Sequence, residues 1–89
     1  MRELRTTAQF KRDLRKARKR GKNPDKLRSI IEKLVAGRPL ARLNKPHRLL
    51  GDWFPCWECH IEPDWLLVWD ENEESVTLMR TGTHSDLFK

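Results

Sequence analysis

The chain has 89 residues, a formal net charge of +6, 36% charged residues and 8% aromatic residues. This length fits one domain, residues 1–89, with a small hydrophobic core. The sequence contains no apolar run close to the roughly 20 residues of a membrane-spanning helix, and it shows no secretory signal. With only two cysteines, these features predict a cytoplasmic protein that has no membrane partner.

Charge is distributed very unequally between the two halves of the chain. Residues 1–48 contain 17 Lys/Arg against 4 Asp/Glu (+13), whereas residues 49–89 contain 2 Lys/Arg against 9 Asp/Glu (−7). A basic half of this kind can bind a polyanion or an acidic protein. It can equally be the solvated surface of a helix, so charge alone does not decide between these interpretations.

The first half predicts a short strand followed by two amphipathic helices. Residues 2–6 favour the strand, and Thr6 begins a capping-box pattern that predicts a helix from about residue 7 to Gly21. Asn23-Pro24 is typical of the start of a second helix, which Gly37 would end. Each helix carries an apolar stripe that we interpret as core. The stripes consist of Phe10, Leu14 and Ala17, and of Leu27, Ile30, Ile31, Leu34 and Val35.

The second half predicts three strands, at residues 55–61, 65–70 and 75–81. The short polar spacers between them, residues 62–64 and 71–74, favour an antiparallel meander. The element order is therefore β-α-α-β-β-β. This order predicts an α+β fold in which two helices cover one face of a small antiparallel sheet and leave the other face open.

The three histidines are the best candidates for chemistry, because the unperturbed imidazole pKa of about 6.5 allows proton donation and acceptance near neutral pH. His60 and Asp64 flank a tight turn, so we expect their side chains to meet at the rim of the sheet. The meander is expected to bring His47 and His84 toward the same face. Arg80 would stabilise charge on a transferring phosphoryl group or pair with an acidic residue of its own half.

Cys56 and Cys59 have the spacing C-x-x-C, but a strand would point them to opposite faces of the sheet. We therefore expect neither a redox pair nor a zinc site. The histidines and Asp64 lack any recognised ligand spacing, and no metal site is predicted.

Three segments in the second half form a specific combination: residues 47–53 (HRLLGDW), 60–67 (HIEPDWLL) and 80–88 (RTGTHSDLF). Together they resemble the YafQ branch of the RelE-like bacterial toxins, and the resemblance extends over essentially the whole chain. It implies a type II toxin that cleaves mRNA on the 70S ribosome and needs no metal or other cofactor. It also implies a cognate antitoxin, often of the ribbon-helix-helix kind, and contact with operator DNA only through the toxin–antitoxin complex.

The same resemblance assigns roles to individual residues. The implied catalytic residues are His47, His60, Asp64 and His84. The implied substrate-binding residues are Arg80, Phe88 and Trp65. RNA would be cleaved by in-line attack of its own 2′-OH, with His60 or Asp64 as the base and His84 as the acid for the leaving 5′-oxygen. His47 and Arg80 would hold the phosphate, and Phe88 would stack on a base.

The cations of the first helix have a separate role in this interpretation, which is docking on ribosomal RNA. The candidate docking residues are Lys11, Arg12, Arg15, Lys16, Lys19 and Arg20.

Two other functions remain open. A ParE-like toxin shares this fold, has no nuclease activity and binds a protein such as gyrase, because a fold alone does not determine a function. A plain nucleic-acid-binding module would use only the basic helices. The three histidines and the segment at residues 60–65 argue against both alternatives. Arrest of translation rather than replication in cells would distinguish the nuclease from the gyrase-binding toxin.

Overall fold

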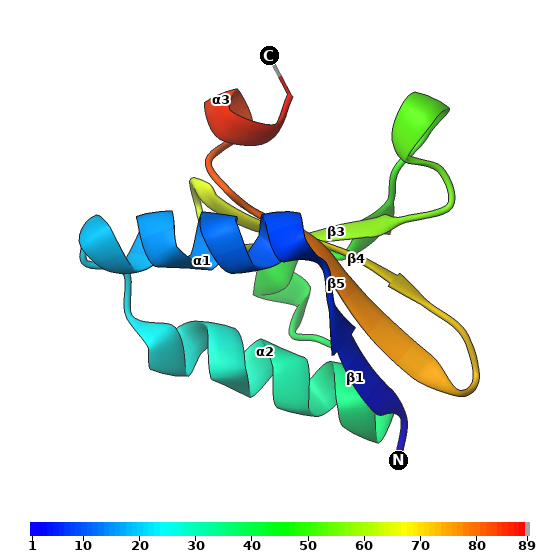
Figure 1. Ribbon diagram of the computed structural model, residues 1–89. Coiled ribbons are helices and arrows are strands. Elements are labelled where there is room, and N and C mark those ends of the chain that lie inside the picture. The colour runs from blue at the N-terminus through cyan, green and yellow to red at the C-terminus, as the bar shows by residue number, and fades with distance from the viewer. Residues whose placement is uncertain (89) are drawn as a thin grey trace.

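The computed structural model describes residues 1–88, which form a mixed five-stranded sheet with two long helices on one face (Figure 1). The strands are β1 (Glu3–Thr6), β2 (His47–Arg48), β3 (Trp57–Glu62), β4 (Trp65–Glu71) and β5 (Ser75–Gly82). The helices are α1 (Ala8–Lys19), α2 (Pro24–Ala36) and the short α3 (His84–Leu87), with 3₁₀ turns at Arg42–Asn44 and Gly51–Trp53. The predicted α+β fold is confirmed, and β2 and α3 are additions to it.

The order of strands across the sheet is β1-β5-β4-β3-β2. The pairs β2–β3, β3–β4 and β4–β5 are antiparallel, as the short turns of the predicted meander require. β1 lies parallel to β5 at the edge. A strand that reaches the sheet through two helices is not constrained by a hairpin turn, so it can take either direction. The sheet is therefore an antiparallel meander with one parallel edge strand.

α1 begins one residue later than the capping pattern predicts. Thr7 is the N-cap, and its side-chain oxygen accepts a hydrogen bond from the Phe10 N–H at 2.9 Å. Thr6 does not take this position because its backbone still pairs within the sheet, opposite Leu78. The Thr7 hydroxyl also donates to the Met79 carbonyl at 2.9 Å, which fixes the start of α1 to β5.

α2 begins and ends at the predicted residues. Asn23 accepts a hydrogen bond from the Asp25 N–H at 2.9 Å, and Pro24 occupies the first helical position, where its missing N–H costs nothing. Gly37 ends the helix at φ +71°, a conformation that favours glycine. Among the helices of residues 1–88, none has the length and apolar character needed to cross a membrane.

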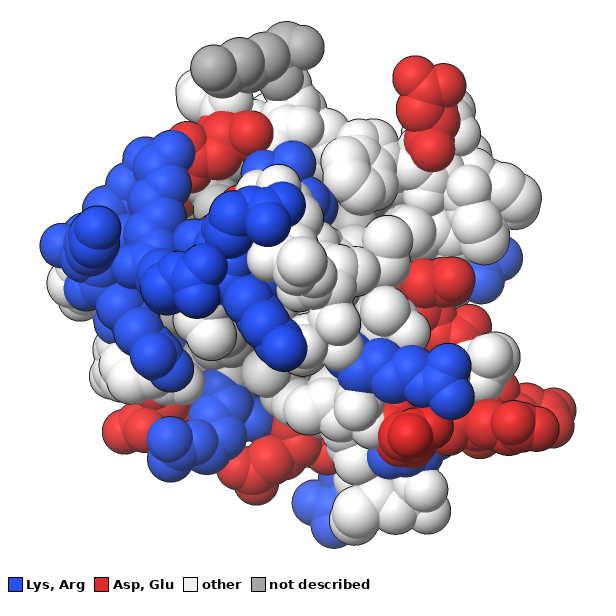
Figure 2. Space-filling view, in the orientation of Figure 1, with Lys and Arg blue, Asp and Glu red and all other residues white. Residues whose placement is uncertain are grey.

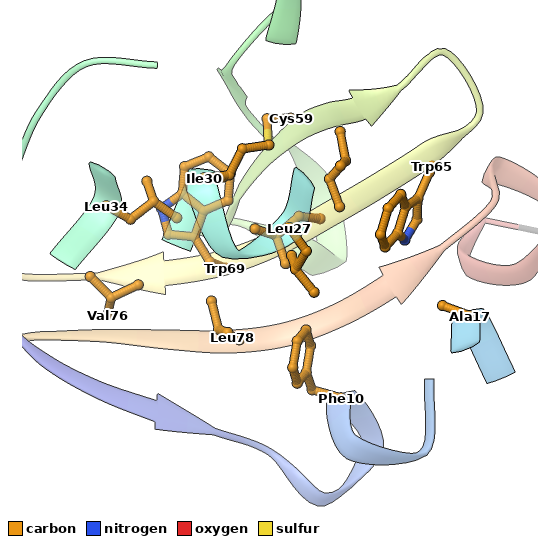
Figure 3. Close-up of a cluster of buried hydrophobic side chains, with 12 residues drawn as sticks. Phe10, Ala17, Leu27, Ile30, Leu34, Cys59, Trp65, Trp69, Val76 and Leu78 are labelled. Atoms are coloured by element: carbon orange, nitrogen blue, oxygen red, sulfur yellow. The ribbon is translucent and has the colours of Figure 1, made fainter. Parts of the chain in front are cut away.

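The main hydrophobic core lies between the two long helices and the sheet (Figure 3). The predicted apolar stripes supply the helical side of this core. Its buried members are Phe10, Ala17, Leu27, Ile30, Leu34, Cys59, Ile61, Trp65, Leu67, Trp69, Val76 and Leu78. Burial of each large side chain contributes about 1.5–3 kcal/mol, so this layer supplies most of the hydrophobic stabilisation.

The opposite face of the sheet, called the second face below, is covered only in part. Leu66 and Val68 of β4 lie on this face in a smaller cluster with Cys56 and Leu87. The partly buried residues around this cluster are Leu49, Trp53, Met79 and Phe88. α3 and the loop at residues 49–54 therefore pack on one part of a face that the sequence analysis expected to be open.

The two cysteines lie in different clusters on opposite faces of the sheet, as strand alternation predicts. Both are free and buried. Burial raises the pKa of Cys59 to about 12 and also raises the pKa of Cys56. Neither thiol is therefore activated as a thiolate.

Candidate functional site

Strand register places the candidate residues in two neighbouring rows on the second face, because directly opposed residues of adjacent strands share a face. The first row consists of His47, Glu58, Val68 and Arg80, from β2, β3, β4 and β5. The second row consists of His60, Leu66 and Gly82, from β3, β4 and β5. Thr83 and α3 follow Gly82 directly, so His84 lies just beyond the second row.

His47 has a polar partner at each ring nitrogen. Nδ1 lies 2.9 Å from the Lys45 carbonyl oxygen and must carry a hydrogen, because a carbonyl oxygen can only accept. Nε2 lies 3.2 Å from Oε1 of Glu58. This contact is an ion pair only when the imidazole is protonated.

Glu58 was absent from the residues predicted for the site. Its side chain is buried, with a relative exposure of 3% for the residue. The signal that could have found it is strand parity, since Glu58 shares the face of His60. The parity did not reveal a partner, because the two-residue strand β2 that brings His47 beside it was not predicted.

His60 and Asp64 take different partners in the structure. The Nδ1 of His60 lies 3.1 Å from the Pro63 carbonyl oxygen and therefore donates to it. Neutral His60 then has its hydrogen on Nδ1, which leaves Nε2 as a bare acceptor. Asp64 Oδ1 instead accepts from the backbone N–H of His84 at 3.2 Å. The tight turn thus connects β3 to the C-terminal segment.

α3 and its C-cap carry two of the predicted site residues, His84 and Phe88. Thr83 is its N-cap and forms a reciprocal capping box with Asp86. The exposed imidazole of His84 lies against Phe88, with ring centroids 5.2 Å apart and an interplanar angle of 54°. Phe88 in turn meets Trp53 edge-on at 6.0 Å. These contacts place His84 and Phe88 above the end of the second face.

Arg80 is held by a bidentate ion pair with Asp13 of α1. Nε and one terminal nitrogen of Arg80 lie 2.7 and 3.2 Å from the two Asp13 oxygens. A partner in the second half was one expectation for Arg80, whereas this partner comes from the first half. Burial opposes ionisation of Asp13, but hydrogen bonds from Arg80, Gln9 and the Thr81 N–H outweigh it and hold the pKa of Asp13 below its usual value.

Trp65 is not brought to the second face. It is 2% exposed and belongs to the main core under the helices. Its Nε1 donates to the Thr81 hydroxyl at 2.9 Å, and that hydroxyl donates to the Leu66 carbonyl at 2.7 Å. The contacts of Trp65 therefore brace β4 and β5, which carry Leu66 and Gly82 of the second row.

The basic side chains of the first half gather over α1, as Figure 2 shows. All six predicted docking residues are exposed. Two of them also have an acidic partner, since Arg20 and Lys16 lie 2.6 and 3.2 Å from Asp86 of α3. The helix is thus both a cationic surface and a support for the C-terminal segment.

The second face therefore combines a bare imidazole nitrogen, a paired histidine and glutamate, and a third imidazole on a short helix. These groups are suited to proton transfer near neutral pH. Within residues 1–88, no three His, Cys, Asp or Glu side chains are grouped so that they could hold a metal ion.

Comparisons with known proteins agree with the architecture. The family described as "Bacterial toxin of type II toxin-antitoxin system, YafQ" matches residues 2–89. The mRNA interferase toxin YafQ of Escherichia coli K12 is 34% identical over 88 residues, which cover 98% of this chain and 96% of that protein. These matches place the chain among the toxins of bacterial type II toxin–antitoxin systems. Within that class, the chain belongs to the YafQ family.

Solved structures of relatives share the fold over nearly their full length. The E. coli DinJ–YafQ toxin–antitoxin complex contains a chain with a TM-score of 0.92 and 34% identity, covering 99% of this chain and 98% of that one. A metal-bound toxin from Helicobacter pylori has a TM-score of 0.92 and 36% identity, covering 99% and 100% of the two chains.

Proposed function

We propose that the chain is a ribosome-dependent mRNA endoribonuclease that inhibits translation and is silenced by a cognate antitoxin. Two lines of support meet here. The E. coli relative is named an mRNA interferase, and the second face of this chain carries the proton-transfer groups that RNA cleavage requires. The observation that carries the proposal is the placement of His60 and His84 on either side of β4.

The proposed chemistry is in-line attack of the RNA 2′-OH on the adjacent phosphorus. His60 accepts the 2′-OH proton at Nε2, because its Nδ1 hydrogen is committed to the Pro63 carbonyl. His84 donates a proton to the leaving 5′-oxygen. β3 and β5 are separated by β4, so their backbones stand about 10 Å apart at the usual strand spacing. This separation lets a phosphate lie between the two imidazoles.

The other residues of the face stabilise charge and orient the RNA. His47, paired with Glu58, is proposed to contact a non-bridging phosphate oxygen. Arg80 keeps donors free of Asp13, since a guanidinium has five N–H groups and two are used in this pair. Phe88 is partly exposed and offers a ring on which a base can stack. Asp64 positions His84 through its backbone N–H.

The partners follow from the same proposal. The basic surface of α1 docks on ribosomal RNA through phosphate contacts. The antitoxin assignment is supported by the DinJ–YafQ complex among the structural relatives. A ribbon-helix-helix antitoxin would contact operator DNA, and the toxin would reach that DNA only through the complex. The reaction is proposed to need no metal.

Primer extension on mRNA from cells that express the chain tests the proposal. Cuts within the reading frame, spaced by codons and absent upstream of the start codon, are expected for a ribosome-dependent nuclease. His84→Gln provides a matched control, because the side chain is exposed and its loss should leave the fold intact. Uncut mRNA together with arrested replication would instead indicate a gyrase-binding toxin.

A further inference from the structure

We propose that Asp86 is a positioning residue, which holds His84 over the second face by tying α3 to α1 through Arg20 and Lys16. The inference rests on the proposed role of His84 in cleavage. In the C-terminal segment, only His84 and Phe88 have a role in the proposed cleavage. The inference gives Asp86 a role as well.

α3 needs external support because it contains only four residues. The first turn of a helix is unfavourable to form, so a helix this short is not stable by its own hydrogen bonds. Leu87 provides an apolar contact, as it is buried in the smaller cluster. Leu87 fixes one side of the helix and the hydrogen bond from the His84 N–H to Asp64 fixes its first residue, but a further contact is needed to hold the helix in one orientation over the second face.

Asp86 supplies the missing constraint through four contacts. One Asp86 oxygen accepts from the Thr83 N–H at 2.9 Å and from Arg20 at 2.6 Å. The other oxygen accepts from the second terminal nitrogen of Arg20 at 3.3 Å and from Lys16 at 3.2 Å. One carboxylate therefore caps α3 and joins it to α1, which Figure 1 shows close beneath it.

The electrostatics agree with a permanently ionised anchor. Hydrogen bonds from Arg20 and from the Thr83 N–H hold the pKa of Asp86 well below its usual range. The Asp86 carboxylate reciprocally raises the pKa of Arg20. Both partners stay charged across the range in which histidines titrate, so the anchor does not weaken when His84 changes its protonation state.

The backbone before α3 is shaped around the same carboxylate. A Cβ on Gly82 would lie 3.0 Å from Asp86 Oδ2 and 3.1 Å from Asp86 Cβ. Glycine at this position therefore permits the close approach of the Asp86 side chain to β5. The connection from β5 to His84 is compact because Asp86 folds back over it.

This arrangement divides the six cations proposed for docking into two groups. Arg20 and Lys16 use part of their charge to hold α3. The other four cations are Lys11, Arg12, Arg15 and Lys19. Replacement of Arg20 would therefore alter cleavage in two ways, by changing the position of His84 and by lowering the affinity for RNA.

Single-turnover cleavage of mRNA on programmed ribosomes tests the anchor. Asp86→Asn keeps an acceptor for the cap but removes the charge, and it should slow cleavage at saturating toxin roughly 10-fold to 100-fold, the cost of misplacing a reacting group by about 1 Å. Asp86→Glu should retain most of the rate, since glutamate is favoured at this position of a capping box. Asp25→Asn is the matched control, because it removes the charge of an exposed aspartate on α2.

Two further comparisons separate positioning from docking. Ribosome affinity should be unchanged or slightly higher in Asp86→Asn, because the variant removes a negative charge. In a His84→Ala background, Asp86→Asn should cause no further loss. A wild-type rate in Asp86→Asn, a loss that lies entirely in affinity, or an undiminished loss in the His84→Ala background would each overturn the proposal.

A measurement without RNA tests the Asp86 anchor independently of the proposed function. Hydrogen exchange at the amides of Leu87 and Phe88, which donate to the carbonyls of Thr83 and His84, should accelerate in Asp86→Asn and stay unchanged in Asp25→Asn. Unchanged exchange would refute the anchor. Accelerated exchange in a chain that lacks nuclease activity would uphold the anchor and refute the function.

Discussion

His47 and Glu58 form a direct pair across β2 and β3, with Nε2 of the imidazole 3.2 Å from Oε1 of a buried carboxyl group. The other imidazole nitrogen is committed to the Lys45 carbonyl. The pair therefore lies on the face where phosphate is proposed to bind. Glu58, a carboxylate outside the predicted site, is therefore expected to influence the proposed chemistry through its contact with His47.

Glu58→Gln should lower the cleavage rate roughly 10-fold to 100-fold, because a neutral amide attracts Nε2 of His47 less than a carboxylate does and the imidazole is then held less firmly at the phosphate. The melting temperature should change little, since glutamine has nearly the same shape. Single-turnover cleavage and thermal unfolding measure the two effects. Glu73→Gln, in an exposed turn, is the control. Equal cleavage rates for the two variants would show that Glu58 has no role in the reaction.

Asp13→Asn should destabilise the fold by about 2 kcal/mol at pH 7, because Asp13 accepts charged hydrogen bonds from Arg80 in a buried position. The folded pKa of Asp13 is lowered. Its stabilisation is therefore complete above the unfolded pKa of about 3.9 and is lost as the pH falls through the folded value.

The difference in unfolding free energy between wild type and Asp13→Asn should accordingly shrink below about pH 4. Denaturant unfolding at a series of pH values measures it. Asp25→Asn, which changes an exposed aspartate, should track the wild type throughout. A gap between wild type and Asp13→Asn that stays constant down to pH 2 would contradict the ion-pair interpretation.

The sequence predicted the parts of the fold that depend on local signals. Asn23, Pro24 and Gly37 specify the ends of α2 through interactions within a few residues. The apolar stripes and the meander followed from periodicity in the same way. The N-cap of α1 lies only one residue from the predicted position. Thr6 and Thr7 are both suitable caps, and the pairing of Thr6 with β5 decides between them.

The parts that the sequence did not predict depend on contacts between distant residues. β2 contains two residues and exists only because it pairs with β3. α3 is stabilised by side chains from α1 and from the turn at Asp64. The partners of His47 and Arg80 were missed for the same reason, since Glu58 and Asp13 are brought to them by tertiary packing.

Replacement of Lys11, Arg15 and Lys19 by glutamine should weaken binding to purified ribosomes and flatten its dependence on salt, because fewer counterions are then released. These residues are exposed on α1 and their replacement leaves the Asp86 anchor in place, so thermal stability should barely change. Binding of free toxin at several salt concentrations measures the effect.

The matched control for this triple variant neutralises three exposed cations outside α1, namely Arg5, Arg28 and Arg38. It removes the same net charge from other surfaces. A similar loss of affinity in both variants would mean that net charge alone attracts the toxin to the ribosome and that α1 has no special part in docking.

Cleavage should persist in a chelator that binds transition metals and leaves magnesium to the ribosome, because the proposed acid and base are imidazoles. The metal-bound relative from Helicobacter pylori makes this test informative for the family. Reaction rates with and without 1,10-phenanthroline provide the comparison. A loss of activity that zinc or copper restores would indicate a metal-assisted reaction in place of acid–base catalysis.

The central role proposed for the second face is to direct the RNA 2′-OH onto its own phosphate. A programmed ribosome carrying mRNA with a single 2′-deoxy nucleotide at the cleavage position tests it most directly. The unmodified mRNA should yield a 2′,3′-cyclic phosphate and a 5′-hydroxyl, and the deoxy mRNA should remain uncut at that position. Cleavage of the deoxy mRNA at the same position and rate would contradict the account.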